Sequence, residues 1–257
     1  MEVVLIGSGN VATQLGLALK DKNVTVKQVY SNNIIHAEKL GKKLNVSYIS
    51  NISDIYRNAD IYIYALKDSV LRSVLKKINI PDGIHVHTGG SISMNVFKGF
   101  ASKFGVFYPL QTFSINKPVD FSNIPICIEA VSMEVQKKLV ELAGLISQKT
   151  YIINSEKRKS LHLAAVFASN FTNYLYDAAY KILQDSGIDF EIIQPLILET
   201  AEKIKTMTPF DAQTGPAMRM DKKTISAHLS MLNKKRDLKK IYKLLTYDIN
   251  KRHNPNN

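Results

Sequence analysis

The sequence predicts an α/β domain with a doubly wound, mostly parallel sheet, followed by an all-helical C-terminal domain. Short apolar runs alternate with helical stretches up to about residue 154, which is the pattern of parallel strands joined by crossover helices. These runs are continuous rather than alternating with polar residues, as expected of strands buried on both faces. Beyond that point every periodic stretch has helical spacing. We therefore divide the chain into residues 1–154 and 155–257.

Eight strands and their connecting helices are expected in the first domain. The expected strands are residues 3–6, 24–30, 46–49, 60–66, 84–87, 104–108, 125–129 and 150–153. Helices are expected over residues 14–19, 35–43, 53–57, 69–77 and 133–147, with a turn at Pro81–Gly83. The first five strands and four short crossovers fit within about 90 residues, which favours parallel connections.

The second domain begins with a long helix over 156–185, whose apolar residues cover nearly half of its girth. Such a helix is buried on more than one side, as at a domain or subunit interface, so we expect a homodimer built from this domain. Further helices are expected over 189–205, broken or kinked at Pro195, and over 222–232 and 237–249. A loop is expected over 208–216, and residues 254–257 are expected to be a disordered tail.

Composition and charge indicate which kinds of partner the protein binds and in which compartment it is expected. The net charge is +12, but the lysines are scattered and no nucleic-acid motif accompanies them, so we attribute the charge to solvated helix faces. Cys127 is the single cysteine and lies in an apolar run, which indicates a core position and a reducing compartment. We expect no signal peptide, because the first residues form a strand, and no apolar run reaches about 18 residues. The expectation is a cytoplasmic protein that binds neither membrane nor nucleic acid.

A glycine-rich turn follows the first strand. Val3–Ile6 leads into Gly7-x-Gly9-x-x-Ala12 and then into a helix. This is the strand–turn–helix of a Rossmann-type dinucleotide site, in which the glycines allow a tight turn and close approach of the backbone to the pyrophosphate. The helix N-terminus then presents free N–H groups to the anion. The alternative is a plain strand-to-helix turn. The expected cofactor contacts here are Gly7, Ser8, Gly9, Asn10 and Val11.

The end of the second strand bears on which dinucleotide binds. An NAD site has an acidic residue about 20 residues beyond the glycines, whereas this chain has Ser31, Asn32 and Asn33 there. Since a carboxylate would repel a 2′-phosphate, its absence favours NADP over NAD, with NAD as the alternative. Lys39, Lys42 and Lys43 are near enough to assist. An Asn-rich turn that binds nothing would have the same sequence.

Later strand ends supply further expected cofactor contacts, because ligands of open α/β sheets bind at the carboxyl ends of the strands. These contacts are Ala65, Leu66, Lys67, Thr88 and Gly89. Asp68 follows directly; it is part of this site or only the N-cap of the next helix, and the two roles are compatible.

Five stretches together resemble a known family that joins a Rossmann-like domain to a C-terminal domain of unknown function. They are residues 7–12 (GSGNVA), 87–91 (HTGGS), 105–113 (GVFYPLQTF), 162–171 (HLAAVFASNF) and 212–219 (AQTGPAMR). The family is similar to pyrroline-5-carboxylate reductase and to the 6-phosphogluconate and 3-hydroxyacid dehydrogenases. The resemblance implies an NAD(P)-dependent oxidoreductase fold, often dimeric through the helical domain.

The chain departs from these relatives at two positions. Many of them have a basic residue near the place of Asn32. The hydroxyacid dehydrogenases have a catalytic lysine four residues before an asparagine on the first long helix; Asn170 matches that asparagine, but Val166 stands in the lysine's place. Oxidation of a hydroxyacid by the lysine mechanism is therefore not expected.

Histidine is the natural proton donor for hydride-transfer chemistry, because its ordinary pKa is near neutrality. On an ideal helix, residues 162, 166, 169, 170 and 173 share a face, so we expect His162 and Asn170 as catalytic residues. The alternative is that these polar groups only bond to neighbouring loops. The expected substrate-binding residues are His87, Ser91, Gln111, Thr112, Asn173 and Arg219. Arg219 would suit a carboxylate or phosphate.

The histidines are dispersed and no ligand motif is present, so no metal site is expected. The sequence thus favours an NADP-dependent oxidoreductase that reduces a small polar carbonyl or imine in a cleft between the two domains. The alternative is a non-catalytic dinucleotide-binding sensor or assembly protein, which the valine at position 166 supports.

Overall fold

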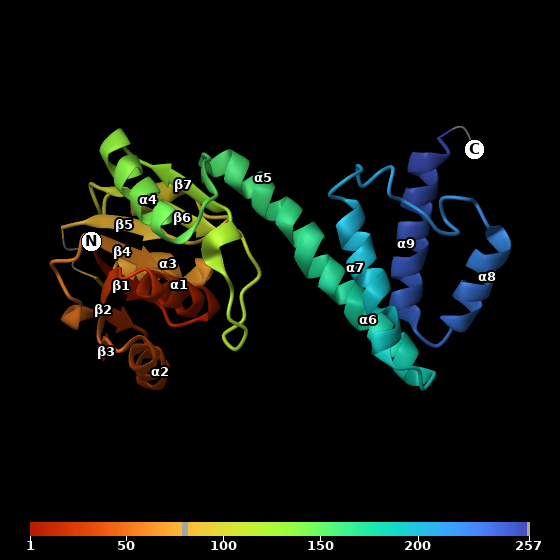
Figure 1. Ribbon diagram of the computed structural model, residues 1–257, viewed down its shortest axis with the longest axis horizontal. Coiled ribbons are helices and arrows are strands. Elements are labelled where there is room, and N and C mark those ends of the chain that lie inside the picture. Colours follow the sequence, from red (N-terminus) through yellow and green to blue (C-terminus); the bar gives the residue numbers. More distant parts are fainter. Residues whose placement is uncertain (79–81, 256–257) are drawn as a thin grey trace. The chain divides into compact units, whose positions relative to one another are not determined.

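Figure 1 shows the computed structural model, which describes residues 1–78 and 82–255. The chain forms two compact units, Met1–Asn170 and Phe171–Asn257, and each is described by itself. The first unit extends past the end of the last strand, where the sequence places the domain boundary, because Arg158 on the following helix bonds to the sheet. The turn expected at Pro81 and the last two residues of the expected tail lie outside the described residues.

A single mostly parallel sheet organises the first unit. Its strands in the described residues are β1 (Glu2–Ile6), β2 (Thr25–Tyr30), β3 (Ser47–Ile49), β4 (Ile61–Tyr64), β5 (Ile84–His87), β6 (Phe104–Pro109), β7 (Ile126–Ala130) and β8 (Thr150–Ile152). Their order is β3-β2-β1-β4-β5-β6-β7-β8. Every neighbouring pair is parallel except β6 and β7, which are antiparallel. The expected doubly wound sheet is confirmed.

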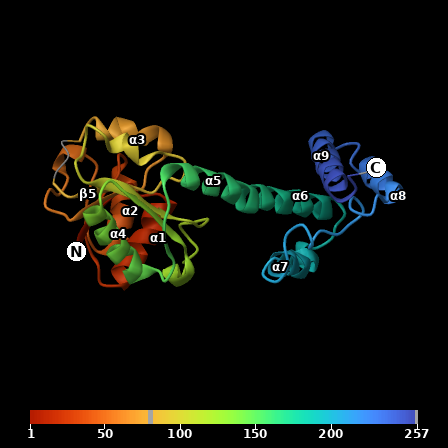
Figure 2. The same ribbon diagram turned by 90° about the horizontal axis from the view of Figure 1, so that it is seen from above.

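Helices cover both faces of this sheet. Figure 2 shows α3 (Asp68–Leu75) on one side, and α1 (Asn10–Asp21), α2 (Ile34–Leu44) and α4 (Met133–Ile146) on the other. Successive residues of β1 point to opposite faces, so Val3 belongs to the core with Leu15 of α1, whereas Val4 belongs to the core with Leu71 of α3. Burial on both faces explains why the strands read as continuous apolar runs.

The connection expected as a helix over 53–57 is instead a short 3₁₀ turn, η1 (Ile52–Asp54). The backbone N–H of Tyr56 donates to the side chain of Gln28 at 2.8 Å, and its carbonyl accepts from the Tyr62 hydroxyl at 2.9 Å. These side chains take the backbone groups that a helix would have used, so tertiary contacts override the local pattern. Similar short turns are η2 (Met94–Phe97) and η3 (Phe121–Asn123). Cys127 is buried, as expected.

The long helix expected over 156–185 is helical throughout but not uniform. It consists of α5 (Ser155–Ala165), the π-helical η4 (Val166–Phe171) and α6 (Thr172–Asp185). A π-turn inserts an extra residue into a helical turn and often occurs at functional sites. The junction between the two units falls at its end.

The second unit is helical in all its described regular structure. After α6 come η5 (Phe190–Ile193), α7 (Gln194–Lys203), α8 (Lys222–Met231) and α9 (Arg236–His253). The helix expected over 189–205 is broken at Pro195, which is one of the two expected outcomes: η5 ends at Ile193, and α7 begins at Gln194. Pro195 lies in the first turn of α7, where its missing N–H has no intrahelical partner to lose. Among the described helices, none combines the length and the apolar character needed to cross a membrane.

The two glycines of the turn after β1, Gly7 and Gly9, differ in how tightly the backbone around them is constrained, and alanine substitutions compare them. Gly7 has a φ of +126°, and a Cβ added there would lie 2.2 Å from the Ala65 carbonyl oxygen, whereas no atom lies within 4 Å of a Cβ added at Gly9. We expect Gly7→Ala to lower the free energy of unfolding by about 2 kcal/mol or more, and Gly9→Ala to change it by less than about 1 kcal/mol. Urea unfolding of both variants measures this. Equal losses would contradict the assignment of strain to Gly7.

Candidate functional site

A pocket of about 940 Å³ lies in the first unit, at the carboxyl edge of the sheet. Three strand ends contribute to it: the turn after β1, the segment after β4 and the segment after β5. The end of β6 and the helix formed by α5 and η4 complete the walls. The lining residues include Gly9, Asn10, Val11, Ala65, Leu66, Lys67, Asp68, Thr88, Gly89, Gly90, Tyr108, Gln111, Thr112, His162, Val166, Ser169 and Asn170. Most of the residues expected from the sequence therefore meet in one place.

The turn at Gly9 forms an open cradle at the start of α1. Gly9 is the N-cap of that helix, and no side chain caps it. The space beside Gly9 is free of protein atoms, as the position of an added Cβ shows. Gly7 and Ser8 do not line the pocket; the Gly7 N–H donates to the Tyr30 carbonyl at 2.8 Å and so shapes the turn. An uncapped helix N-terminus beside open space fits the pyrophosphate of a dinucleotide.

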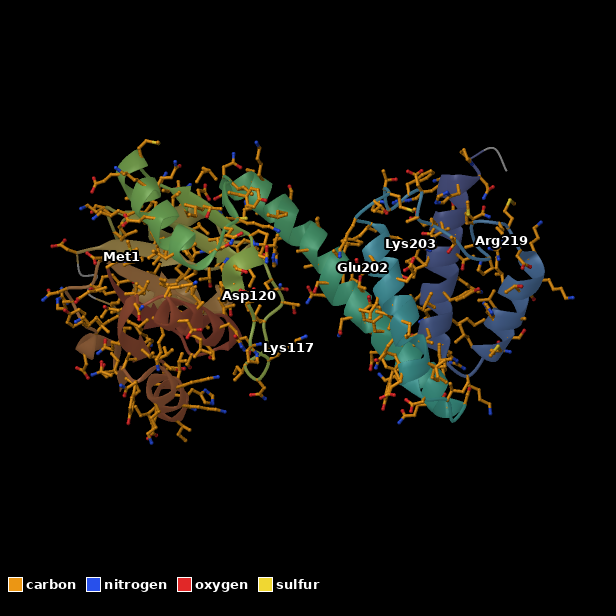
Figure 3. The ribbon with its side chains drawn as sticks, in the orientation of Figure 1. Met1, Lys117, Asp120, Glu202, Lys203 and Arg219 are labelled. Carbon is orange, nitrogen blue, oxygen red and sulfur yellow. The ribbon has the colours of Figure 1, made fainter. Side chains whose placement is uncertain are left out.

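Asn10 ties this cradle to the loop after β6. Its side-chain amide donates to the Phe113 carbonyl at 2.8 Å. Gln14, one turn further along α1, donates to the carbonyl of Ser114 at 2.6 Å and of Lys117 at 3.0 Å. Figure 3 places Lys117 on this loop. The loop that carries Gln111 and Thr112 is thus held against the glycine turn.

The residues after β2 are not part of the pocket lining. Ser31 is buried, and the Asn33 side-chain oxygen accepts from the N–H groups of Ile35, at 2.9 Å, and His36, at 3.4 Å, as the N-cap of α2. This cap uses the oxygen of Asn33 and leaves its amide nitrogen available as a donor. The role expected for Ser31, Asn32 and Asn33 stays a prediction.

His162 and Tyr108 form the polar centre of the pocket wall. The Tyr108 hydroxyl lies 3.1 Å from His162 Nδ1, and the rings meet edge to face. Burial raises the pKa of Tyr108 to about 12, so the phenol keeps its proton at neutral pH. Gly90 packs against the same imidazole, since a Cβ added there would lie 2.5 Å from Nδ1. Sequence reasoning missed both Tyr108 and Gly90, although each occupies a strand-end position where ligands bind.

The helical wall follows the face expected from the sequence as far as the first unit reaches. His162, Val166, Ser169 and Asn170 all line the pocket. Asn173 and Arg219 belong to the second unit, and neither is among the residues that line this pocket. Arg219 is in the segment that joins α7 to α8 in the sequence and is labelled in Figure 3.

Two expected substrate contacts, His87 and Ser91, are not among the residues that line the pocket. His87 is 1% exposed, its ring stacks on Phe97, and its Nδ1 accepts from the Gly89 N–H at 3.1 Å. It points to the sheet face covered by α3, because residues alternate along a strand. Ser91 donates its hydroxyl to the Asp68 carboxylate. Both residues support the loop that contains Gly89 and Gly90.

The bond from Ser91 also bears on the capping role expected for Asp68. The N-cap of α3 is Lys67, which has no side-chain capping bond, and Asp68 is the first helical residue. The capping role expected for Asp68 is therefore wrong, because its carboxylate accepts from Ser91 instead of from the helix backbone.

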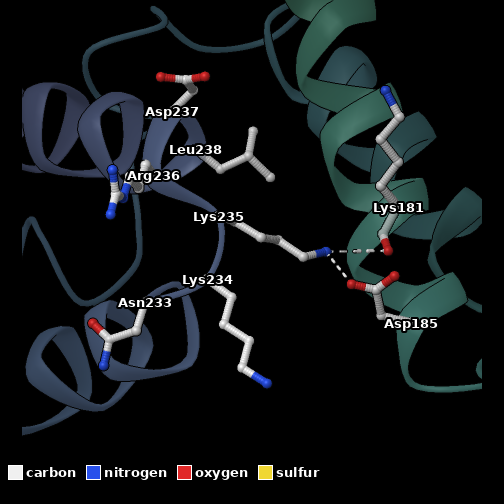
Figure 4. Close-up of a pocket in the computed structure, with 8 residues that line it drawn as sticks. All are labelled: Lys181, Asp185, Asn233, Lys234, Lys235, Arg236, Asp237 and Leu238. Carbon is white, nitrogen blue, oxygen red and sulfur yellow. Dashed lines mark hydrogen bonds and ion pairs between the residues drawn. The ribbon is translucent and has the colours of Figure 1, made fainter.

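A second cavity, of about 870 Å³, belongs to the second unit and is lined by Lys181, Asp185 and residues 233–238 (Figure 4). Its central cation, Lys235, bonds to the Asp185 carboxylate and to the Lys181 carbonyl, as Figure 4 shows. None of the residues expected to bind a ligand lines it. The described residues contain no cluster of three or more His, Cys, Asp or Glu side chains able to hold a metal ion.

The sheet order and the glycine turn after β1 define the class of the first unit as a Rossmann-type domain. Residues 2–87 match the family described as "NADP oxidoreductase coenzyme F420-dependent", and residues 124–249 match the domain of unknown function DUF2520. The second match begins just before β7, so it includes the last two strands of the sheet. A comparison with curated proteins finds no match.

Among solved structures, the "putative NADP oxidoreductase" of Bacteroides fragilis is 41% identical, with a TM-score of 0.92 over 97% of this chain and 98% of that one. The chain therefore belongs to the family of that protein, in which an NADP oxidoreductase-type domain is followed by DUF2520. A 1-pyrroline-5-carboxylate reductase from Streptococcus pyogenes is 16% identical, with a TM-score of 0.66 over 97% of this chain and 98% of that one. An imine reductase from Myxococcus stipitatus, solved with NADP⁺, is 15% identical, with a TM-score of 0.69 over 97% and 93%. These two share the fold.

The buried His87 predicts a loss of stability in acid. Burial, helped by the nearby charge of Arg158, lowers the pKa of His87 to about 3. The unfolded chain binds this proton near pH 6.5, so stability is lost as the pH falls from about 6.5 towards 3, by up to about 1.4 kcal/mol per pH unit. We expect His87→Gln to remove this part of the slope. Urea unfolding of both proteins between pH 7.5 and pH 5 measures it, and parallel slopes would contradict it.

Proposed function

We propose that the protein is an NADP-dependent reductase of a small polar carbonyl or imine compound. The observation that carries the proposal is the His162–Tyr108 hydrogen bond, which lies on the wall of the same pocket as the open cradle at Gly9. A hydride transfer needs a cofactor site and a proton donor that face one substrate position. Membership in an NADP oxidoreductase family supports this combination.

Each wall of the pocket has a proposed task. The turn at Gly9 and the N-terminus of α1 bind the pyrophosphate, and Thr88 and Gly89 contact the end of the cofactor that carries the hydride. When bound, the cofactor would supply a hydride to the substrate carbon. His162, as the imidazolium, donates its Nε2 proton to the carbonyl oxygen or imine nitrogen and becomes the neutral imidazole, while its Nδ1–H donates to the Tyr108 hydroxyl oxygen. Asn170 orients the acceptor atom, since it lies on the same helical wall.

Gln111 and Thr112 are the proposed contacts to the substrate's polar groups, because both line the pocket on a loop held by Asn10. The substrate roles of Asn173 and Arg219 remain predictions from the sequence. Val166, in the place of the relatives' lysine, lines the pocket with an apolar side chain. In the proposed chemistry His162 is therefore the proton donor, and Val166 takes no part in proton transfer.

The cofactor preference is tested by calorimetry. We expect NADPH to bind more tightly than NADH, because the end of β2 offers amide and hydroxyl donors and no carboxylate. Gly9→Val should abolish binding of both, since its side chain would fill the free space beside the turn, while Gly9→Ala controls for loss of glycine. Equal or reversed affinities would contradict the preference for NADP.

The role of His162 is tested by turnover of NADPH with a panel of keto acids, aldehydes and imines. If His162 supplies the proton, His162→Ala should lower kcat by roughly a hundredfold or more with little change in NADPH affinity. His162→Gln keeps a hydrogen-bonding group and should be equally impaired, because an amide does not donate its proton. Recovery of activity by His162→Gln would show that the residue only orients its neighbours. NADPH binding without turnover of any compound would favour a non-catalytic sensor or assembly protein.

We also propose a homodimer assembled through the helical region, in the cytoplasm. Large apolar side chains there are more than half exposed, including Leu163, Ile192, Leu196, Leu198, Met231, Leu244 and Tyr247. Exposed apolar surface of this extent is unusual on a monomer and marks an interaction site. Light scattering at micromolar concentration should give twice the chain mass of 28.9 kDa. A monomeric mass would contradict the proposal.

A further inference from the structure

Arg158 is the largest completely buried side chain in the described residues, and it lies one helical turn before His162. Its guanidinium group contacts three parts of the first unit. Nη1 donates to the Glu129 carboxylate, while Nη2 donates to the Ile92 carbonyl and, at 3.3 Å, to the Ser155 hydroxyl. Ser155 in turn donates its own hydroxyl to Glu129 at 2.8 Å. Binding several acceptors at once in this way requires arginine, because a lysine ammonium lacks the planar array of N–H donors.

The three elements that Arg158 joins are those that surround His162. The imidazole is carried by α5, packs against Gly90 and bonds to Tyr108 of β6. Arg158 is on the same helix, and Ile92 is two residues after Gly90. Glu129 is on β7, where Tyr108 pairs with Cys127, two residues earlier and on the same face of the sheet. One ion pair, with its guanidinium completely buried and its carboxylate 12% exposed, thus joins α5, the glycine loop and the β6–β7 ladder at a single point.

Stability alone does not account for such a pair. Burying two charges has a large desolvation cost, and replacement of a buried ion pair by apolar residues of similar volume is often neutral or stabilising. Here Nε of Arg158 is also buried without a hydrogen-bond partner in the described residues, which adds to that cost. What the pair does provide is a fixed distance and direction between the helix and the strand.

We propose that Arg158 and Glu129 are positioning residues that hold His162 in register with Tyr108 and Gly90. The expected effect on catalysis rests on the proposed function. The placement of the His162 ring by the ion pair does not depend on it. If the ion pair is loosened, α5 can shift relative to β6, and the hydrogen bond between Tyr108 and Nδ1 should weaken. Displacements of about 1 Å in catalytic groups can lower rates by about a hundredfold.

The test reads the geometry directly from the ring nitrogens of His162. In ¹⁵N-histidine-labelled protein, the Nδ1 signal is assigned by its absence in His162→Gln, and Tyr108→Phe gives the shift that marks loss of the hydrogen bond. We expect Arg158→Lys and Glu129→Gln to move the Nδ1 signal in the same direction as Tyr108→Phe. The matched control is Lys159→Met, which removes the neighbouring exposed cation and its surface ion pair with Glu156; its Nδ1 signal should match that of the wild type.

Folding and activity are measured on the same proteins. The double variant Arg158→Met with Glu129→Leu removes both charges at similar volume and serves if a single variant unfolds, because no lone charge remains buried. In folded variants we expect kcat to fall roughly ten- to a hundredfold with KM for NADPH nearly constant. An unshifted Nδ1 signal in every folded variant would overturn the inference. A shifted signal together with full activity of His162→Ala would uphold the positioning of His162 and overturn its proposed catalytic role.

Discussion

Burial of β1 on both faces is the constraint on which the first unit depends. Its residues Val3 to Ile6 are completely buried, alternately against α1 and α3. After Ile6 the chain turns away from the carboxyl end of β1 while β4 continues beside it. The turn approaches the Ala65 carbonyl so closely that only glycine fits at position 7. The uncapped start of α1 and the free space at Gly9 follow directly from this geometry.

The pocket is a consequence of parallel strand order. The carboxyl ends of β1, β4, β5 and β6 lie at one edge of the sheet, and each is followed by residues that line the pocket. Its polar groups differ in kind: the glycine turn offers backbone N–H groups, whereas His162 and Tyr108 offer protons held by side chains. The proposed reduction of a carbonyl or imine would use both kinds of group, the N–H groups for the cofactor and the side-chain proton for the substrate.

Support for these groups comes from residues that do not reach the pocket. His87 accepts from the Gly89 N–H from beneath, and Asn10 and Gln14 hold the loop after β6. Arg158 is the extreme case, since it is completely buried yet bonds to the loop, the helix and β7. In the proposed role, the ion pair between Arg158 and Glu129 fixes the direction in which α5 presents His162.

The sequence by itself determined the order and type of nearly all elements, because continuous apolar runs and helical periodicity are local patterns. It also indicated the glycine turn, whose spacing has a local physical cause, and His162 and Asn170, which share a helical face. Tertiary structure alone decided the rest. Residues 53–57 do not form the expected α-helix because Gln28 and Tyr62 bond to the backbone groups of Tyr56. His87 is buried against Phe97 and does not line the pocket. Tyr108, Gly90 and Arg158 were missed because their importance arises from contacts with residues 54, 72 and 29 positions away, respectively, and no local pattern encodes such contacts.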